Sequence, residues 1–281
     1  MSFKTILVHL DHSDRCSCRV ALAAALARKY GSHLIGLLPT GLYDGVIPAD
    51  AIPVGATDFI AESADYLHRR ADAISDTFRA HLTGSNPVSS EIRCIDGTTA
   101  DAIVDHGRSS DLIVLGQEEK SSESDTPVHR LVAQAMLHSG RPVLVVPYAG
   151  DFEAVGKNVL VAWDGSRESA VAMRAALPLL IEATRVTLVS LRRSDQRHDP
   201  DRVLLVAEMI HWLQRHGVRA VVEQGVTEVA ISDALLSRAS DLSVDLIVMG
   251  GYGHSRLREL MLGGVTRQVL ARMTVPVLIA H

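Results

Sequence analysis

The sequence repeats itself, and this repeat limits the possible fold more than any other feature. "KTILVHLDHS" (residues 4–13) resembles "KNVLVAWDGS" (157–166) at a separation of 153 residues, which matches Asp11 with Asp164 and Ser13 with Ser166. Near the other end of each half, "DLIVLG" (111–116) matches "DLIVMG" (245–250), and "RPVLVVP" matches "VPVLIAH", at a separation of 134. Self-similarity on this scale predicts two similar structural units in one chain.

Apolar runs begin and end both halves. "TILVHL", "HLIGLL", "DLIVLG" and "PVLVVP" have the counterparts "NVLVAW", "RVTLVSL", "DLIVMG" and "PVLIAH". Runs that are apolar throughout are typical of strands buried on both faces of a parallel sheet. Between them, "SCRVALAAALARKYG" and "SRESAVAMRAALPLLIEA" carry the apolar spacing of helices. We therefore predict an α/β fold of two tandem doubly wound parallel-sheet domains, residues 1–150 and 151–281, which are joined near "YAGDFEAVG".

The two separations differ by 153 minus 134, so the first half carries 19 more residues in its middle. We place these extra residues around positions 39–59, where "PTGLYDGVIPADAIPVGATDF" is rich in Gly and Pro. That composition predicts a long loop.

Charge and hydropathy exclude some classes of protein. A net charge of -5 argues against a chain that binds nucleic acid through an overall positive field. No stretch reaches the roughly 18 to 20 apolar residues that a membrane span needs, and the N-terminus lacks the features of a secretory signal. We therefore expect a cytoplasmic protein. Cys16, Cys18 and Cys94 have no zinc-like spacing, so we assign them no metal.

A glycine-rich stretch near the end of the chain, "VMGGYGHSRLRELMLGGVTRQVL" (248–270), follows a predicted strand and leads into a helix near Val265. Ligands of open parallel sheets bind beyond the carboxyl ends of the strands, and glycines let backbone N–H groups converge on an anion at a helix N-terminus. His254, Arg256 and Arg258 add charge, and Thr266 adds a hydroxyl. The sequence has no P-loop, and G-x-G-x-x-G follows the first strand of neither half. These glycines could also form only a turn and a helix entry.

The spacing Gly250-x2-Gly253-x9-Gly263-Gly264 closely resembles the ATP-binding signature of the universal stress protein family, G-x2-G-x9-G-[ST]. Gly264 departs from it, because the signature has Ser or Thr there. The resemblance covers nearly the whole chain and implies a tandem member of the family with a five-stranded parallel sheet in each half. It also implies bound ATP, ADP or AMP, which would bring Mg²⁺ with it.

By resemblance, Asp164 contacts the adenine nucleoside, Ala162 and Trp163 flank the base, and Val189 lies against the adenine. The glycines surround the ribose and phosphates. The full set of residues that we assign to the nucleotide is Ala162, Trp163, Asp164, Val189, Met249, Gly250, Gly253, His254, Arg256, Gly263, Gly264, Val265 and Thr266. Asp164 could instead cap a helix or form a turn within "DGS".

The first half reads differently at the positions of the glycine stretch: "GQEEKSSESDTPVHRLVAQAML" (116–137). Gly253 corresponds to Glu119, Gly263 to His129, Gly264 to Arg130 and Thr266 to Val132. A carboxylate where a phosphate would lie is repelled by it, and side chains block approach to the backbone. We therefore predict that the first half does not bind ATP. We interpret Asp11 as a structural residue that caps the following helix, and the acidic loop as solvated or as a contact for a basic partner.

No catalytic motif appears, and the sequence does not require turnover. The leading hypothesis is a nucleotide-binding regulatory protein of the stress response, whose two halves pair inside one chain. A slow ATPase or a phosphoryl- or adenylyl-transfer enzyme is one alternative, and a nucleotide-free interaction protein is another. An unidentified protein partner is expected, and a further homodimer stays open.

Overall fold

The computed structural model describes residues 2–40, 71–83, 87–118, 131–195, 200–251 and 264–281. The strands are β1 (Thr5–His9), β2 (His33–Pro39), β3 (Ser90–Ile95), β4 (Leu112–Gly116), β5 (Val143–Val146), β6 (Asn158–Ala162), β7 (Arg185–Arg193), β8 (Ala220–Thr227), β9 (Leu246–Gly250) and β10 (Val277–Ala280). The helices are α1 (Cys16–Tyr30), α3 (Thr99–Gly107), α4 (Leu131–Ser139), α5 (Arg167–Glu182), α6 (Pro200–Arg215), α7 (Ile231–Asp241) and α8 (Gly264–Arg272), and residues 71–82 are also helical.

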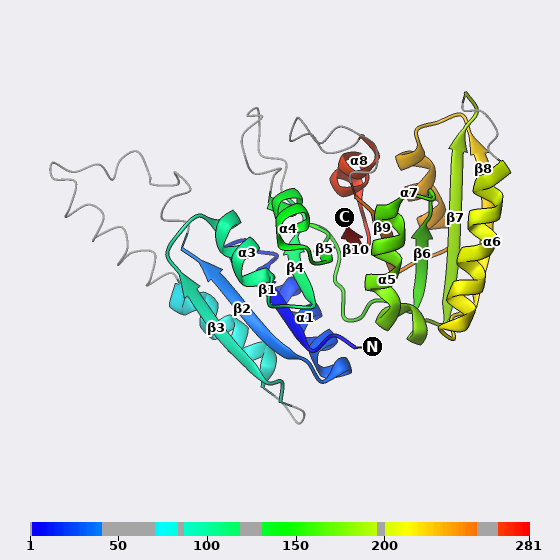
Figure 1. Ribbon diagram of the computed structural model, residues 1–281. Coiled ribbons are helices and arrows are strands. Elements are labelled where there is room, and N and C mark those ends of the chain that lie inside the picture. Colours follow the sequence, from blue (N-terminus) through cyan, green and yellow to red (C-terminus); the bar gives the residue numbers. More distant parts are fainter. Residues whose placement is uncertain (1, 41–70, 84–86, 119–130, 196–199, 252–263) are drawn as a thin grey trace, which may run out of the picture.

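All ten strands form one sheet in the order β3-β2-β1-β4-β5-β10-β9-β6-β7-β8 (Figure 1). Each half uses the same internal order: its third, second, first, fourth and fifth strands lie side by side. Neighbouring strands are parallel except at the centre, where β5 and β10 run antiparallel with Val145 opposite Val277. The predicted α/β class with a mostly parallel sheet is confirmed. The antiparallel pair was not predicted, and it follows from two halves that meet through their last strands.

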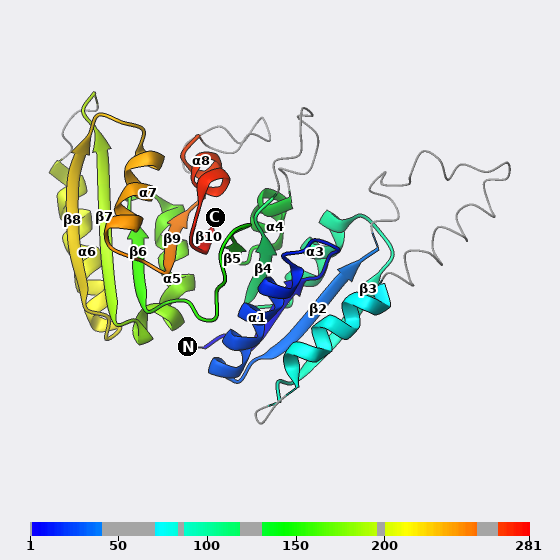
Figure 2. The same cartoon turned by 180° about the vertical axis from the view of Figure 1, so that it is seen from behind.

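Helices cover both faces of the sheet (Figure 2). One apolar cluster joins the sheet to α1, α5, α6 and the helix at 71–82, and a second cluster joins it to α3, α4, α7 and α8. Strand residues such as Ile6, Leu7 and Leu160 are fully buried, because successive side chains point into the two clusters. This double covering explains why the central strands are apolar throughout.

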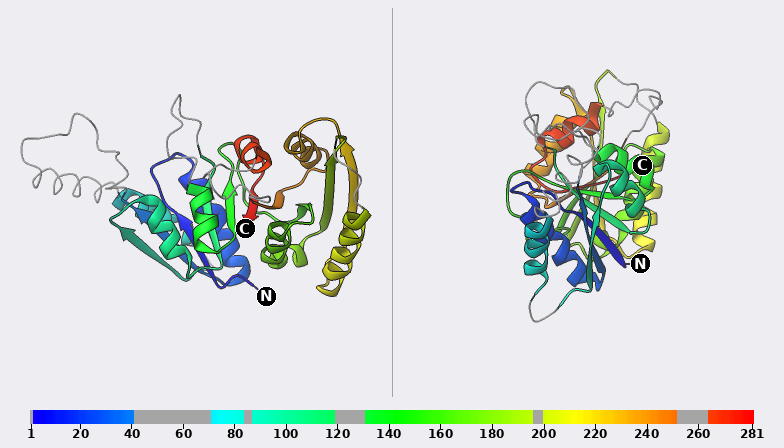
Figure 3. Two further views of the ribbon diagram at one scale, coloured as in Figure 1. Left: turned by 45° about the horizontal axis from the view of Figure 1, so that its top comes forward. Right: turned by 90° about the vertical axis from the view of Figure 1, so that its left-hand side faces the viewer.

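The strands at the two ends of the sheet, β3 and β8, lie apart from each other at the far sides of the molecule (Figure 3). Their sequences, "SEIRCI" and "AVVEQGVT", contain polar residues and are largely exposed. The apolar-run criterion therefore missed both strands. The predicted long loop around 39–59 lies almost entirely outside the described residues.

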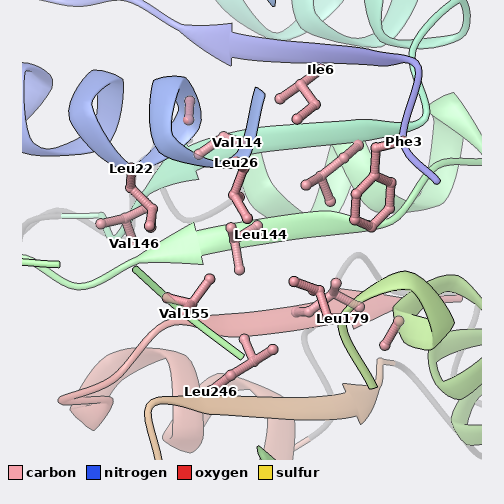
Figure 4. Packing of buried hydrophobic residues seen from close by; sticks show 14 of the residues in the cluster. Phe3, Ile6, Leu22, Leu26, Val114, Leu144, Val146, Val155, Leu179 and Leu246 are labelled. Carbon is pink, nitrogen blue, oxygen red and sulfur yellow. The ribbon is translucent and has the colours of Figure 1, made fainter. Parts of the chain in front are cut away.

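Side chains from both halves form a continuous core where the halves meet (Figure 4). Phe3 and Leu144 of the first half belong to the same buried cluster as Leu179 and Leu246 of the second. On this face α1 also reaches α5, since Lys29 Nζ lies 2.9 Å from Glu182 Oε2 and Tyr30 donates a hydrogen bond of 3.1 Å to the Pro178 carbonyl. The two halves are thus packed together through the sheet and through their helices.

The repeated aspartates before β4 and β9 hold the amino ends of the central strands. Asp111 Oδ2 accepts hydrogen bonds from the backbone N–H groups of Lys4 (2.7 Å) and Thr5 (3.0 Å). Asp245 does the same for Gly156, Lys157 and Asn158 at 2.8–3.1 Å. These aspartates lie at the opposite edge of the sheet from the carboxyl ends of the strands. Their presence in both halves is therefore explained by their role in the fold.

Among the described helices, none has both the length and the apolarity that a membrane crossing requires.

Candidate functional site

The second half has a switch point between β6 and β9. From β6 the chain continues to β7 and β8 on one side, and it then returns to β9 and β10 on the other. In open sheets of this kind, the crevice at the carboxyl ends of the two diverging strands is the usual ligand site. Asp164 follows β6, and Gly250 ends β9. Two of the predicted nucleotide residues therefore lie on either side of this switch point.

Three predicted residues form an apolar row across adjacent strands. Ala162 is paired with Val189 of β7 on one side and with Met249 of β9 on the other. All three belong to the apolar cluster on the α7 and α8 face of the sheet. Trp163 is 5% exposed, and its indole belongs to the cluster on the opposite face, although its backbone N–H donates to the Val189 carbonyl at 2.9 Å. The structure thus brings Ala162 and Val189 together and places the ring of Trp163 elsewhere.

Asp164 takes part in the tight turn that leads into α5. Its Oδ1 accepts hydrogen bonds from Ser166 N (3.0 Å) and Ser166 Oγ (2.6 Å). Gly165 has φ +80, which favours glycine, and Ser166 caps α5 by accepting from Ser169 N at 3.1 Å. The turn explanation for "DGS" is therefore confirmed, and Ser166 is the helix cap. Contact between Asp164 and a nucleotide stays a prediction.

Gly250 allows α5 to approach the end of β9. A Cβ atom on this residue would lie 2.5 Å from Ser169 N and 2.6 Å from the carbonyl carbon of Glu168. Next to it, the ring of His281 donates from Nδ1 to the Gly251 carbonyl at 3.0 Å. Burial opposes ionisation of Glu168, but its own backbone N–H, Arg167 and His281 hold the pKa of this carboxyl below its usual range.

Glu168 and His281 were both missed from the sequence. His281 adjoins the site only because β10 ends beside β9, and sequence spacing does not reveal that neighbour.

Helix α8 begins at Gly264, next to the position predicted from the sequence. Nothing lies within 4 Å of a Cβ atom placed on Gly264, and Val265 is exposed. Thr266 is 4% exposed, so its side chain faces the interior. Arg272 Nη1 bonds to Asp233 Oδ1 at 2.7 Å and ties α8 to α7. The predicted residues Gly253, His254, Arg256 and Gly263 lie outside the described residues, as does Arg258.

An open groove of about 800 Å³ adjoins the apolar row. Its walls are the ends of β7, the face of β8 and helix α7. Val189 and Leu191 of β7 contribute to its lining, together with the charged residues Glu223, Asp233 and Arg238. The groove therefore combines apolar and charged groups next to the apolar row.

In the first half, the equivalent switch point between β1 and β4 contains a buried arginine. Arg19 of α1 is 2% exposed. Its Nε donates to the His9 carbonyl at 2.8 Å, and its Nη2 lies 2.8 Å from Asp11 Oδ2. A Cβ atom on Gly116 would collide with its Nη1. At a separation of 153 residues, the second half has Ala172 in this place.

This cluster shifts the protonation of its members. Burial lowers the pKa of His9 to about 4, and Arg19 lowers it further than Asp11 raises it. Burial opposes ionisation of Asp11, but Arg19 and His9 hold its pKa below the usual value. Asp11 also accepts from Ser13 N (3.0 Å) and Ser13 Oγ (2.6 Å), as Asp164 does from Ser166. Asp11 is thus structural, but the prediction that it caps α1 is wrong, because the N-cap is Arg15 without a side-chain bond.

Glu118 lies at the start of α4 in the first half. Its carboxyl group accepts hydrogen bonds from the backbone N–H groups of Leu131 (3.1 Å) and Val132. Burial raises the pKa of Glu118 to about 7, and the two backbone bonds oppose this shift. At a separation of 134 residues, Leu131 and Val132 correspond to Val265 and Thr266.

Glu118→Gln should stabilise the chain at alkaline pH and leave it unchanged in acid. The folded pKa of about 7 exceeds the ordinary value of 4.5, so the folded state binds the proton more tightly. This contribution is complete below pH 4.5 and is lost as pH rises through 7. Chemical denaturation should give a variant advantage on the order of 2 kcal/mol at alkaline pH. Stability curves of the parent and of Glu118→Gln that run parallel from acid to alkaline pH would contradict this pKa.

A metal site is not apparent in the part of the chain that the structure describes, where no group of three or more His, Cys, Asp or Glu could hold an ion. Cys16, Cys18 and Cys94 are free thiols.

The fold and the switch-point geometry define a doubly wound α/β protein with a candidate ligand site at the carboxyl ends of its central strands. Residues 156–281 match the model of the universal stress protein family. Universal stress protein Slr1230 of Synechocystis is 26% identical, and the match covers 98% of this chain and 99% of the relative. The second half of the chain thus matches the universal stress protein family, and nearly the whole chain is similar to a universal stress protein.

Two further likenesses accompany these matches. The crystal structure of a universal stress protein from Archaeoglobus fulgidus is 16% identical, covers 98% of this chain and 97% of its own, and has a TM-score of 0.73. This similarity shows that the two proteins share a fold. Universal stress protein MJ0577 of Methanocaldococcus jannaschii is 38% identical over 47 residues, which cover 17% of this chain and 29% of the relative.

Proposed function

We propose that the C-terminal half, residues 151–281, binds ATP or a related adenine nucleotide, and that the chain acts as a cytoplasmic regulatory protein of the stress response. The observation that carries this proposal is the convergence of Ala162, Asp164, Met249 and Gly250 at the carboxyl ends of β6 and β9, beside Val189 of β7, around one switch point. This is where open α/β sheets bind their ligands.

The proposed ligand follows from the chemistry of this convergence. The apolar row of Ala162, Val189 and Met249 and the groove beyond Val189 suit the adenine ring. Asp164, after β6, would accept hydrogen bonds from the ribose. The N-terminus of α8, whose start at Gly264 is open, suits the phosphates together with Gly253 and Gly263. Mg²⁺ would enter with the nucleotide and neutralise the phosphates.

The site is connected to the N-terminal half, and this connection supports a signalling role. A Cβ atom on Gly251 would meet Met136 Sδ at 2.6 Å, so this residue of the glycine stretch packs against α4. In the reciprocal contact, Gln117 Nε2 donates to the Leu270 carbonyl of α8 at 2.8 Å. A nucleotide that binds the glycine stretch would therefore change contacts at the junction of the halves. We expect a protein partner, or a second copy of the chain, to read that change.

The chain as purified should carry or bind one adenine nucleotide. Mass spectrometry of ligand released from the protein identifies the nucleotide, and calorimetry with ATP and Mg²⁺ gives the stoichiometry. Two nucleotides per chain would contradict a silent first half, and none would favour a nucleotide-free interaction protein. Steady-state ATP turnover above that of a Gly253→Glu control would favour an enzyme.

A further inference from the structure

The N-terminal half has the same strand order as the C-terminal half, and therefore an equivalent crevice at the carboxyl ends of β1 and β4. We propose that this half is closed by its own side chains: the carboxyl group of Glu118 takes the place of a ligand phosphate on the N-terminus of α4, and Arg19 bridges the adjoining ends of β1 and β4. This inference deepens the proposed function, because it names the described contacts that keep the first half empty.

Arg19 connects the ends of the two diverging strands. Its guanidinium group is fixed by the His9 carbonyl and the Asp11 carboxylate at 2.8 Å each, and it lies against Gly116 at the end of β4. It therefore bridges the carboxyl ends of β1 and β4 from the α1 side of the sheet. In the second half Ala172 stands at the equivalent position, and the backbone of α5 lies against Gly250 instead.

Glu118 acts on the adjoining helix. The first backbone N–H groups of a helix have no partner within the helix, and they attract anions. In α4 the carboxyl group of Glu118 accepts from two of these groups, those of Leu131 and Val132. Their counterparts in α8, Val265 and Thr266, are where the nucleotide phosphates are proposed to bind. A carboxyl group supplies oxygen acceptors of the same kind as a phosphate, and it is covalently attached.

The two side chains act at neighbouring points. Arg19 lies against Gly116, and Glu118 is two residues further along the chain. Arg19 therefore holds the ends of β1 and β4, and Glu118 occupies the N-terminus of the adjoining helix α4. The acidic residues that the sequence points to, Glu119, Glu123 and Asp125, lie outside the described residues. The N-terminus of α4 is occupied instead by the carboxyl group of Glu118, which precedes these residues in the sequence.

Hydrogen exchange of α4 in the full chain tests this inference. Glu118→Ala should raise the exchange rates of the α4 amides about fivefold, the usual effect of removing a helix cap. Inorganic phosphate, compared with chloride at equal ionic strength, should then slow these amides back toward the parent rate. In the parent chain and in the exposed control Glu153→Ala, phosphate should leave α4 unchanged.

Several results would overturn the inference. Unchanged α4 exchange in Glu118→Ala would show that the carboxyl group does not hold the helix. If phosphate did not protect α4 in this variant, the N-terminus of α4 would not accept a phosphate. If phosphate protected α4 equally in the parent, the carboxyl group of Glu118 would not occupy that N-terminus. Glu118→Gln keeps an oxygen acceptor and the shape of the side chain, so phosphate should not protect it even if the Ala variant unfolds. Because only α4 is observed, failure here is separate from failure of nucleotide binding at α8.

Discussion

Gly253→Glu should abolish nucleotide binding by the C-terminal half, with a loss of affinity of about a hundredfold or more and no loss of folding. The substitution copies Glu119 of the first half into the glycine stretch. A carboxylate at this position would repel the phosphates and lose its own hydration, and its side chain would keep the backbone N–H groups away from the ligand. About two to three kcal/mol, a typical cost of such an uncompensated charge, corresponds to about a hundredfold.

Calorimetry with ATP and Mg²⁺ measures this effect, and urea denaturation checks that the free energy of unfolding stays within about 0.5 kcal/mol. Gly97→Glu is the matched control, because it adds the same charge in the first half, outside the proposed site, where an added Cβ meets no atom within 4 Å. If Gly253→Glu bound ATP as tightly as the parent, the assignment of the glycine stretch to the phosphates would be wrong.

Arg19→Met should cost about 2 kcal/mol of stability, since it removes a buried guanidinium group that donates to the His9 carbonyl and pairs with the partly exposed Asp11. Methionine keeps most of the length of the side chain, so the loss measures the guanidinium group more than packing. Urea denaturation of Arg19→Met, Asp11→Asn and the double variant gives the coupling between them. The double variant should lose less than the sum of the single variants.

His9 offers a second measurement of the same cluster. Arg19 lowers the pKa of His9, so the imidazole of Arg19→Met should titrate above the present value of about 4. An NMR titration of the ring detects this change. Arg79→Met is the control, because this arginine is exposed and its ion pair with Asp76 lies on the surface. If the stability losses of Arg19→Met and Asp11→Asn were additive and the pKa of His9 did not change, Arg19 would not interact with Asp11 and His9 as described.

Much of the fold could be predicted because the central strands are buried on both faces. A strand such as β1 must then be apolar throughout, and this pattern is visible in a single sequence. The edge strands β3 and β8 carry no such pattern, since solvent reaches one side of each. The antiparallel pairing of β5 with β10 depends on how two complete halves meet, and no local sequence feature records it.

The part of the candidate site that could be predicted consists of motif residues at the ends of strands. Ala162, Asp164 and Gly250 follow from the repeated strands, and the structure places them around one switch point. The ring of Trp163 lies in the cluster opposite Val189, because consecutive residues of a strand point to opposite faces. The sequence does show Arg19 as a charged residue within an apolar helical run, which was a usable signal. The contact of Glu118 with α4 was harder to predict from the sequence, because Leu131 is 13 residues away.

The pairing of β5 with β10 has a consequence for how this protein can change over generations. In a symmetric assembly of identical chains, one codon specifies both binding sites, so a substitution that closes one site closes the other. Here the equivalent positions, Arg19 and Ala172, are separate codons within one continuous sheet. The chain can therefore keep the paired arrangement of its two halves while each half acquires its own function. A substitution in the first half leaves the residues of the second half unchanged.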